Sequence, residues 1–154
     1  YLGIGRVFPF LKAVNCFIED TLGLKLPLEN QNDPNTNRLE KGEQAQVAIF
    51  GEEMKGYATS GDSKTVHIRK WLTDNCFGDY YTRGGLDYKQ REMITFCFLY
   101  GQGDCVPQVM AHIQGNLNLG NDKAFLTNVV LQCVPYMGYP RSLNALACIN
   151  KVED

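Results

Sequence analysis

Three side chains that could carry out chemistry share one face of a predicted helix in the segment 104–121, DCVPQVMAHIQGNLNLGN. Cys105 and His112 are seven residues apart, close to two helical turns, and Gln108 lies between them. Cys105 is expected to have a lowered pKa, because the unpaired N–H groups at a helix start stabilise a thiolate. Histidine side chains exchange protons at neutral pH. The alternative is packing, with Cys105 as a small residue at a helix entry and His112 as a core histidine bonded to a backbone carbonyl.

Two further candidates, Glu92 and Arg83, precede this segment, and Gln108 within it is a candidate for substrate binding. Glu92 lies one turn into an otherwise apolar helix, where it could hold a proton or orient His112; the alternative is an acid that interacts favourably with the helix dipole. Arg83, in a glycine-rich loop, could bind a carboxylate through two parallel hydrogen bonds, or form a surface ion pair. Gln108 could hydrogen-bond a substrate carbonyl.

These side chains depend on helices for their positions, because the hydrophobic spacing along the chain indicates helices and no convincing strand. The fold class is therefore expected to be all-α. Pro135 and Pro140 are expected to kink or divide the last helical stretch. The predicted helices cover residues 1–22, 38–54, about 63–76, 88–100, 105–119 and 123–152.

Polar residues are expected to set the helix boundaries. Asp87 and Gln90 form a loose capping box, and Asp104 followed by Pro107 favours a helix start. The segment 26–37, LPLENQNDPNTN, is rich in Asn and Pro and is expected to be a linker.

The helix at about 63–76 is expected to place His67 on its polar face. Asp62 or Ser63 is expected to cap it. Its apolar spacing predicts a buried side made of Val66, Ile68, Trp71 and Leu72.

Length, charge and cysteine usage limit the classes of protein to consider. The chain has 154 residues, enough for one domain with a core, and its net charge of −2 argues against a nucleic-acid-binding surface. The longest apolar run, residues 93–100, is far shorter than the roughly 20 residues of a membrane span, so no membrane association is expected. Six scattered cysteines without a CxxC pair indicate a reducing cytoplasm rather than a secreted disulfide framework.

The two ends of the chain are similar to each other. Residues 1–15 and 136–150 share Tyr, Gly, Arg, Leu and Asn at five of fifteen aligned positions. Residues 1–30 are therefore expected to be the terminal helix of a preceding repeat plus a linker, with the chain as the second half of a tandem protein or a truncated form of one. The alternative is a chance match between two apolar helices. Arg141 has Arg6 as its counterpart, and a repeated arginine suggests a structural contact.

Three stretches in order resemble the carboxymuconolactone decarboxylase family: FGDYYTRGGLDYKQREMITF (77–96), GDCVPQVMAHIQGNLNLG (103–120) and LQCVPYMGYPRSLNAL (131–146). The resemblance covers about half the chain closely and residues 38–76 more loosely, within an expected domain at 31–154. It implies an alkylhydroperoxidase D-like helical bundle, no metal or organic cofactor, and a small-molecule substrate. It also implies homo-oligomers, trimers or hexamers, with sites near subunit interfaces.

The peroxidase branch of this superfamily carries a glutamate, a CxxC pair and a histidine. Glu92, Cys105 and His112 fall on three of these positions, but Gln108 replaces the second cysteine. A two-cysteine peroxidase needs that second thiol to convert a sulfenic acid into a disulfide. The sequence is therefore closer to the decarboxylase branch, which does not require the pair.

The residues and the resemblance together leave three hypotheses. The first is a cofactor-free decarboxylase-like enzyme that acts on a small carboxylated lactone or related carbonyl acid through proton transfer by His112 and Glu92. The second is a thiol-dependent hydroperoxide reductase that uses Cys105 with an external thiol. The third is a non-catalytic oligomer that binds a small ligand or a partner chain, since a fold does not fix a function.

Overall fold

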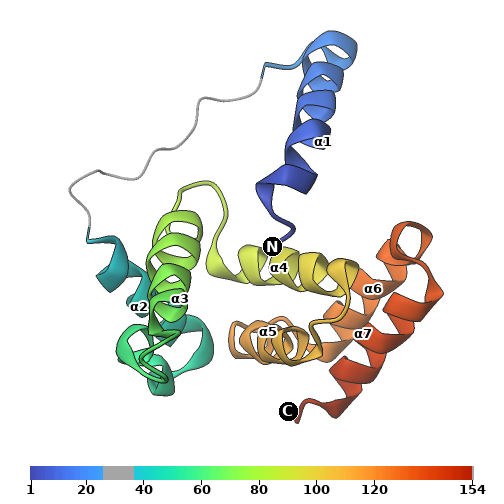
Figure 1. Ribbon diagram of the computed structural model, residues 1–154. Helices are drawn as coiled ribbons and strands as arrows, with labels where there is room; N and C mark the ends of the chain where they lie inside the picture. The colour runs from blue at the N-terminus through green and yellow to red at the C-terminus, as the bar shows by residue number, and fades with distance from the viewer. Residues whose placement is uncertain (26–36, 154) are drawn as a thin grey trace. The chain divides into compact units, whose positions relative to one another are not determined.

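A computed structural model describes residues 1–25 and 37–153 of the chain (Figure 1). These residues form helices and contain no β-strand, which confirms the expected all-α fold. The chain divides into two compact units, residues 1–30 and 31–154, which are described separately below. No helix in the described ranges has the length and hydrophobicity needed to cross a membrane.

Unit 1 contains one helix, α1 (Ile4–Cys16), which continues into a π-helical turn, η1 (Phe17–Thr21). Neither segment contains a buried residue, although most of the large side chains are apolar. The predicted linker at 26–37 lies outside the described residues, apart from Asn37. Asn37 caps the next helix: its Oδ1 accepts a hydrogen bond from the Glu40 N–H at 3.3 Å.

The first half of unit 2 is a helix packed along a π-helical segment. Helix α2 (Arg38–Phe50) leads through two short 3₁₀ turns, η2 (Glu52–Met54) and η3 (Tyr57–Thr59), to α3 (Val66–Trp71) and η4 (Leu72–Tyr81). The backbones of α2 and η4 touch at two glycines: a Cβ on Gly42 would lie 1.9 Å from the Thr73 carbonyl oxygen, and one on Gly78 2.2 Å from that of Arg38. Glycine at both positions therefore allows this close approach.

The predicted buried side of the helix at 63–76 is wrong. Ile68 and Trp71 are 56% and 60% exposed, and His67 lies edge-on against Trp71 at the surface. The α-helix ends at Trp71 and the chain continues as the π-helical segment η4, so the spacing of 3.6 residues per turn does not extend to residue 76 as predicted. The cap is Thr65 rather than Asp62 or Ser63. The residues buried in η4 are Thr73, Phe77, Gly78 and Tyr81.

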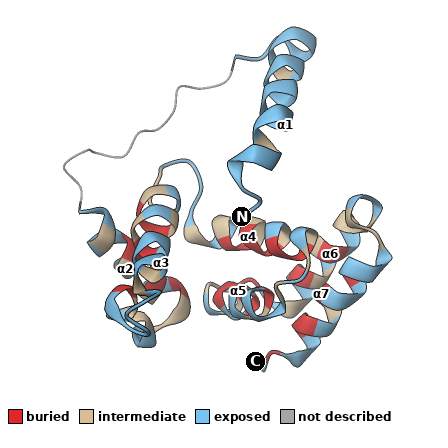
Figure 2. Ribbon diagram, viewed as in Figure 1, coloured by how far each residue is buried: buried red, intermediate tan, exposed pale blue. Residues whose placement is uncertain are grey.

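The second half of unit 2 consists of four helices: α4 (Tyr88–Gln102), α5 (Val106–Asn118), α6 (Lys123–Met137) and α7 (Tyr139–Lys151). Figure 2 shows their buried faces turned toward one another. The capping box of Asp87 and Gln90 is present at the start of α4, and Asp122 caps α6 by accepting from the Phe125 N–H at 2.7 Å. The core contains Phe96, Leu99, Tyr100, Val109, Ile113, Leu126, Val130, Ala145, Cys148, Ile149 and Val152.

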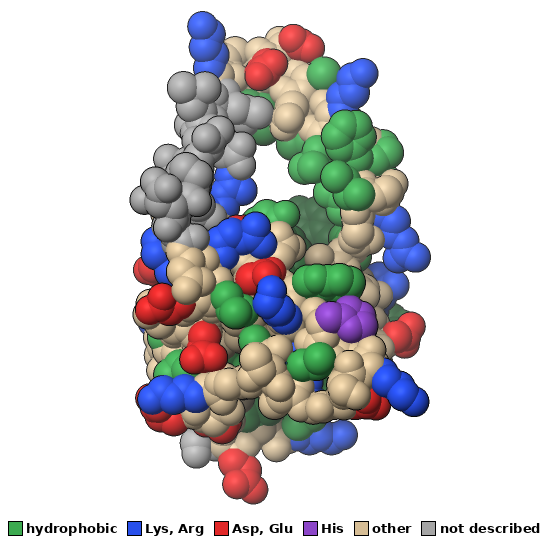
Figure 3. Space-filling view, turned by 60° about the vertical axis from the view of Figure 1, so that its left-hand side comes forward, with side chains coloured by type: hydrophobic (Ala, Val, Ile, Leu, Met, Phe, Trp, Pro, Cys, Tyr) green, Lys and Arg blue, Asp and Glu red, His purple; other side chains and the backbone are tan. Residues whose placement is uncertain are grey.

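Two predicted boundaries differ from the structure. Asp104 does not cap α5; it adopts a positive φ of 57°, and Cys105 is the N-cap residue. Pro135 lies inside α6 without dividing it, and the chain turns at Gly138 instead. On the face of the molecule seen in Figure 3, basic and acidic side chains are interspersed over unit 2.

Candidate functional site

The predicted meeting of Glu92 and His112 occurs in the structure. Glu92 projects from α4 into the interior and is completely buried, and its Oε2 lies 2.7 Å from His112 Nδ1 on α5. A buried carboxylate is stable only with polar partners, so this hydrogen bond offsets part of the cost of removing Glu92 from water. The His112 side chain is 12% exposed and thus reaches solvent while Glu92 does not.

The second carboxylate oxygen of Glu92 is also occupied. The Tyr81 hydroxyl, at the end of η4, donates to Glu92 Oε1 at 2.6 Å and lies 2.6 Å from the Thr95 hydroxyl. Because a phenol carries one proton, the Thr95 hydroxyl is the donor to Tyr81. A continuous hydrogen-bonded chain therefore runs from Thr95 through Tyr81 and Glu92 to His112.

The backbone of α5 approaches Glu92 closely at Gly115. A Cβ on Gly115 would lie 2.9 Å from Glu92 Oε2, from Ile49 Cγ2 and from Phe50 Cε1. Phe50 also packs edge-on against the His112 ring, with 5.2 Å between centroids. Glycine at this position therefore allows α2 and α5 to enclose the carboxylate.

Two buried asparagines hold the helix that carries His112. Asn116 donates to the His112 carbonyl at 2.7 Å, and Asn121 donates to Asn116 Oδ1 at 2.8 Å and to the Lys89 carbonyl at 3.0 Å. Lys89 lies in the first turn of α4, so the network joins the end of α5 to the start of the helix that carries Glu92. It fixes the relative position of the two helices.

A loop at residues 82–87 is held by Arg91, which precedes Glu92 in the sequence. The Arg91 guanidinium donates to the carbonyl groups of Arg83 at 2.7 Å, Leu86 at 3.0 Å and Gly84 at 3.2 Å. Partial burial lowers the pKa of Arg91, with a smaller contribution from the nearby Arg83 charge. The position of the predicted substrate-binding residue Arg83 therefore depends on a side chain of α4.

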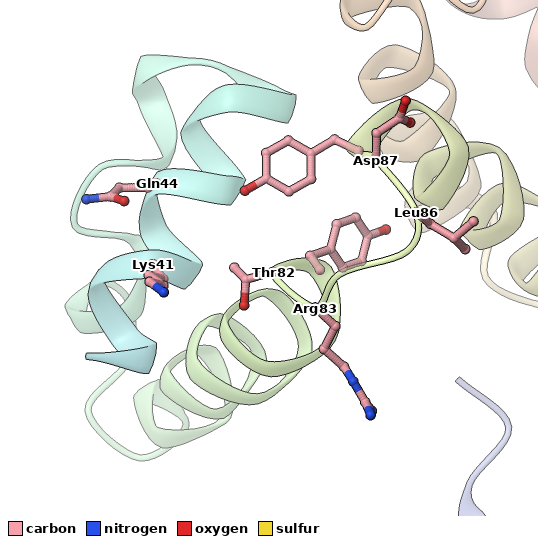
Figure 4. Close-up of a pocket in the computed structure, with 8 residues that line it drawn as sticks. Lys41, Gln44, Thr82, Arg83, Leu86 and Asp87 are labelled. Atoms are coloured by element: carbon pink, nitrogen blue, oxygen red, sulfur yellow. The ribbon is translucent and has the colours of Figure 1, made fainter. Parts of the chain in front are cut away.

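The same loop forms one wall of a surface hollow of about 490 Å³ (Figure 4). Tyr81, the tyrosine bonded to Glu92, also lines this hollow, so it connects the hollow to the Glu92–His112 pair. The Arg83 side chain extends away from Lys41 and Gln44 in Figure 4. Besides Tyr81, the hollow is lined by Lys41, Gln44, Thr82, Arg83, Leu86, Asp87 and Tyr88.

Cys105 lies in a different environment from the one expected. Its thiol donates to the Leu99 carbonyl at 3.2 Å and faces a small hollow of about 40 Å³ that Arg141 also lines. Burial raises the pKa of Cys105, and the Asp104 charge raises it further, so the expected lowering was wrong. Gln108 is exposed on α5. The structure thus brings together Glu92 and His112, while Arg83 and Cys105 line separate hollows.

Tyr81 and Thr95 are site residues that the sequence did not single out. Thr95 lies three residues after Glu92, so the two share a helix face, and this pair of polar residues in an apolar helix was a usable signal. Tyr81 had no such signal, because its position depends on the π-helical winding of η4. Within the described ranges, His, Cys, Asp and Glu residues form no group of three or more that could hold a metal ion.

Comparison with known proteins shows the family to which this chain belongs. The model of the carboxymuconolactone decarboxylase family matches residues 67–151, more than half of the chain. The chain belongs to the carboxymuconolactone decarboxylase family. The matched region contains Glu92, His112, Tyr81 and Cys105.

A similar protein is named as a decarboxylase. Nitrosuccinic acid decarboxylase npaB of Metarhizium robertsii is 25% identical over 122 residues, which cover 78% of this chain and 85% of the relative. Family membership and this relative together support a decarboxylase-like or related function, of the carboxy-lyase type.

Proposed function

We propose that the protein is a cofactor-free decarboxylase that acts on a small carboxylated lactone or a related acid, with His112 and Glu92 transferring the proton. The observation that carries the proposal is the 2.7 Å contact between His112 and a completely buried Glu92. A buried carboxylate bonded to an accessible imidazole fixes the orientation of the ring and the nitrogen that is left for a substrate. This contact gives the pair the geometry needed for general acid–base catalysis.

The reaction needs an electron-accepting group next to the carbon that carries the carboxylate. The bond between that carbon and the carboxylate carbon breaks, CO₂ leaves, and the electron pair delocalises onto the acceptor, such as a lactone carbonyl. His112 Nε2 then delivers a proton to the carbon, and solvent returns a proton to the ring. With Nδ1 held by Glu92, Nε2 is the nitrogen left to do this.

Substrate recognition is proposed to involve the loop beside Glu92. Arg83 lines the larger hollow, and its guanidinium can bind a carboxylate in two-point geometry once the side chain turns inward. Gln108 is retained as a second binding candidate on the exposed side of α5. The Metarhizium robertsii relative is named for a nitro-substituted diacid, which suggests including nitro acids among the compounds to test.

The decisive experiment measures CO₂ release from a panel of carboxylated lactones, β-keto acids and nitro acids. We expect His112→Asn to lower the rate about 10²- to 10⁴-fold, the usual contribution of a positioned acid or base. Glu92→Gln should also lower it, because an amide does not stabilise an imidazolium. His67→Asn, at the exposed histidine, is the matched control and should leave the rate unchanged.

A peroxide-consumption assay run beside the CO₂ assay separates the two alternatives. A hydroperoxide reductase would consume peroxide in a manner that depends on Cys105, and would release no CO₂. A non-catalytic ligand-binding protein would neither release CO₂ from the panel nor consume peroxide. The raised pKa of Cys105 and its hydrogen bond to Leu99 favour the decarboxylase over the reductase.

We further propose that the enzyme works in the cytoplasm as a homo-trimer or hexamer. The apolar side chains exposed on α6 and α7, among them Leu131, Tyr139 and Leu143, provide surface for such contacts. Light scattering coupled to gel filtration measures the oligomer directly. A monomer at micromolar concentration would contradict this part of the proposal.

A further inference from the structure

Helix α1 carries an apolar surface that unit 1 does not cover. No residue of α1 is buried, and its large apolar side chains other than Val7 are half exposed or more. An isolated helix of thirteen residues is marginal in water, because most helical stability in proteins comes from packing an apolar face. The large exposed apolar residues of unit 1 are Tyr1, Leu2, Ile4, Phe8, Phe10, Leu11, Val14, Phe17, Leu22 and Leu24.

The geometry of α1 matches that of α7. The alignment of residues 1–15 with 136–150 pairs Gly3 with Gly138, and each of these glycines is an N-cap with a φ of 78°. Each is followed by an α-helix of thirteen residues, Ile4–Cys16 and Tyr139–Lys151. A positive φ favours glycine at each cap. The likeness in sequence is thus accompanied by the same entry geometry and the same helix length.

The partner of the α1 face can be inferred from α7, whose inner side packs against α4, α5 and α6 in unit 2. The alignment gives an apolar counterpart for every buried position of the α7 segment. The buried residues Ser142, Ala145, Cys148, Ile149 and Val152 correspond to Val7, Phe10, Ala13, Val14 and Phe17. The side that closes the core in α7 is therefore apolar in α1 as well.

We propose that α1 is the closing helix of a second, homologous unit of this fold and packs on the α4–α5–α6 face of that unit as α7 does in unit 2. Two size differences argue against a second copy of this chain as the partner. Phe10 corresponds to Ala145 and Phe17 to Val152, so α1 would overpack the α7 site of unit 2. The inferred partner has smaller side chains opposite those two positions.

A helix exchange tests the equivalence. Residues 139–151 are replaced by 4–16 in a chain that also carries Phe10→Ala within the graft, which removes the overpacking. The matched control grafts residues 38–50, another helix of thirteen residues with a different apolar pattern. We expect the α1 graft to unfold in a single cooperative thermal transition and the control graft to show none. An α1 graft that behaves like the control overturns the proposal.

Hydrogen exchange in the polypeptide encoded by the full reading frame tests the partner. We expect the amides of residues 7–17 to be protected as strongly as those of α7, independently of protein concentration, and Phe10→Asp to remove that protection. Lys12→Asp, a substitution on the same helix outside the apolar set, is the control and should leave it. The proposal is overturned by unprotected amides, by protection that appears only on dimerisation, or by a reading frame with no homologous helical unit ahead of Tyr1.

Discussion

At the scale of single residues, the site is a chain of hydrogen bonds that ends on an imidazole. Both carboxylate oxygens of Glu92 are bonded, one to Tyr81 and the other to His112. The sequence predicted the pairing of Glu92 with His112 from a glutamate and a histidine on successive helices. It did not predict the third partner, Tyr81, because that position depends on the path of η4 between α3 and the loop.

The Tyr81 hydroxyl is predicted to position Glu92. Tyr81→Phe removes one donor and leaves a buried carboxylate oxygen unpaired, which should lower the free energy of unfolding by about 1–3 kcal/mol. It should also slow CO₂ release while changing KM less than kcat. Tyr80→Phe, at the neighbouring exposed tyrosine, serves as the control in urea unfolding. Equal stability of the two variants would show that the buried bond contributes nothing.

The Cys105 thiol is predicted to react slowly. Its pKa is raised by burial and by Asp104, so at pH 8 its thiolate fraction is smaller than that of an unperturbed cysteine. We expect iodoacetamide to modify Cys105 several-fold more slowly than the exposed Cys16, with the difference narrowing as the pH rises. Peptide mass spectrometry follows both sites. Fast, selective modification of Cys105 would instead favour a peroxidase.

At the scale of elements, the capping box that begins α4 was predicted, whereas the caps of α3 and α5 and the π-helical winding were not. Asp87 and Gln90 form that box as their residue types indicate, because capping is a local interaction. The buried side predicted for residues 63–76 was wrong: Ile68 and Trp71 are exposed within α3 itself, and from Leu72 the chain is π-helical, which the residue spacing does not signal. Cys105 was misjudged because its burial comes from helices that are distant in sequence.

The loop at residues 82–87 is predicted to depend on Arg91. Arg91→Met removes three hydrogen bonds to loop carbonyl groups, so amide exchange in residues 83–86 should become at least about tenfold faster, which corresponds to a loss of about 1.4 kcal/mol of local stability. Lys151→Met, an exposed position in α7, is the control. Unchanged exchange in the loop would show that other contacts hold it.

At the scale of the whole molecule, the fold class and family follow from the sequence. The core of unit 2 predicts how the free energy of unfolding should change at alkaline pH. Burial, with a smaller effect from Cys133, raises the pKa of Cys97 to about 12. The folded thiol keeps its proton above pH 9, while the unfolded one releases it. Ionisation of the thiol therefore favours the unfolded chain between about pH 9 and pH 12. The free energy of unfolding is highest below this window and falls as the pH rises through it.

The alkaline loss of stability is predicted to weaken in Cys97→Ala. The wild-type free energy of unfolding should fall more steeply between pH 9 and pH 11 than that of this variant. Cys16→Ala, at an exposed site, should keep the wild-type slope. Parallel slopes for all three proteins in urea titrations would contradict the assignment.

The most direct test of the account is the origin of the proton that replaces CO₂. With a substrate that the panel identifies, turnover in D₂O should place one deuterium on the reacting carbon in a single configuration, because His112 Nε2 delivers it from one side. His112→Asn should lose both the rate and the configuration, while His67→Asn keeps both. A His112→Asn variant that decarboxylates at the wild-type rate with the same configuration would contradict the central claim.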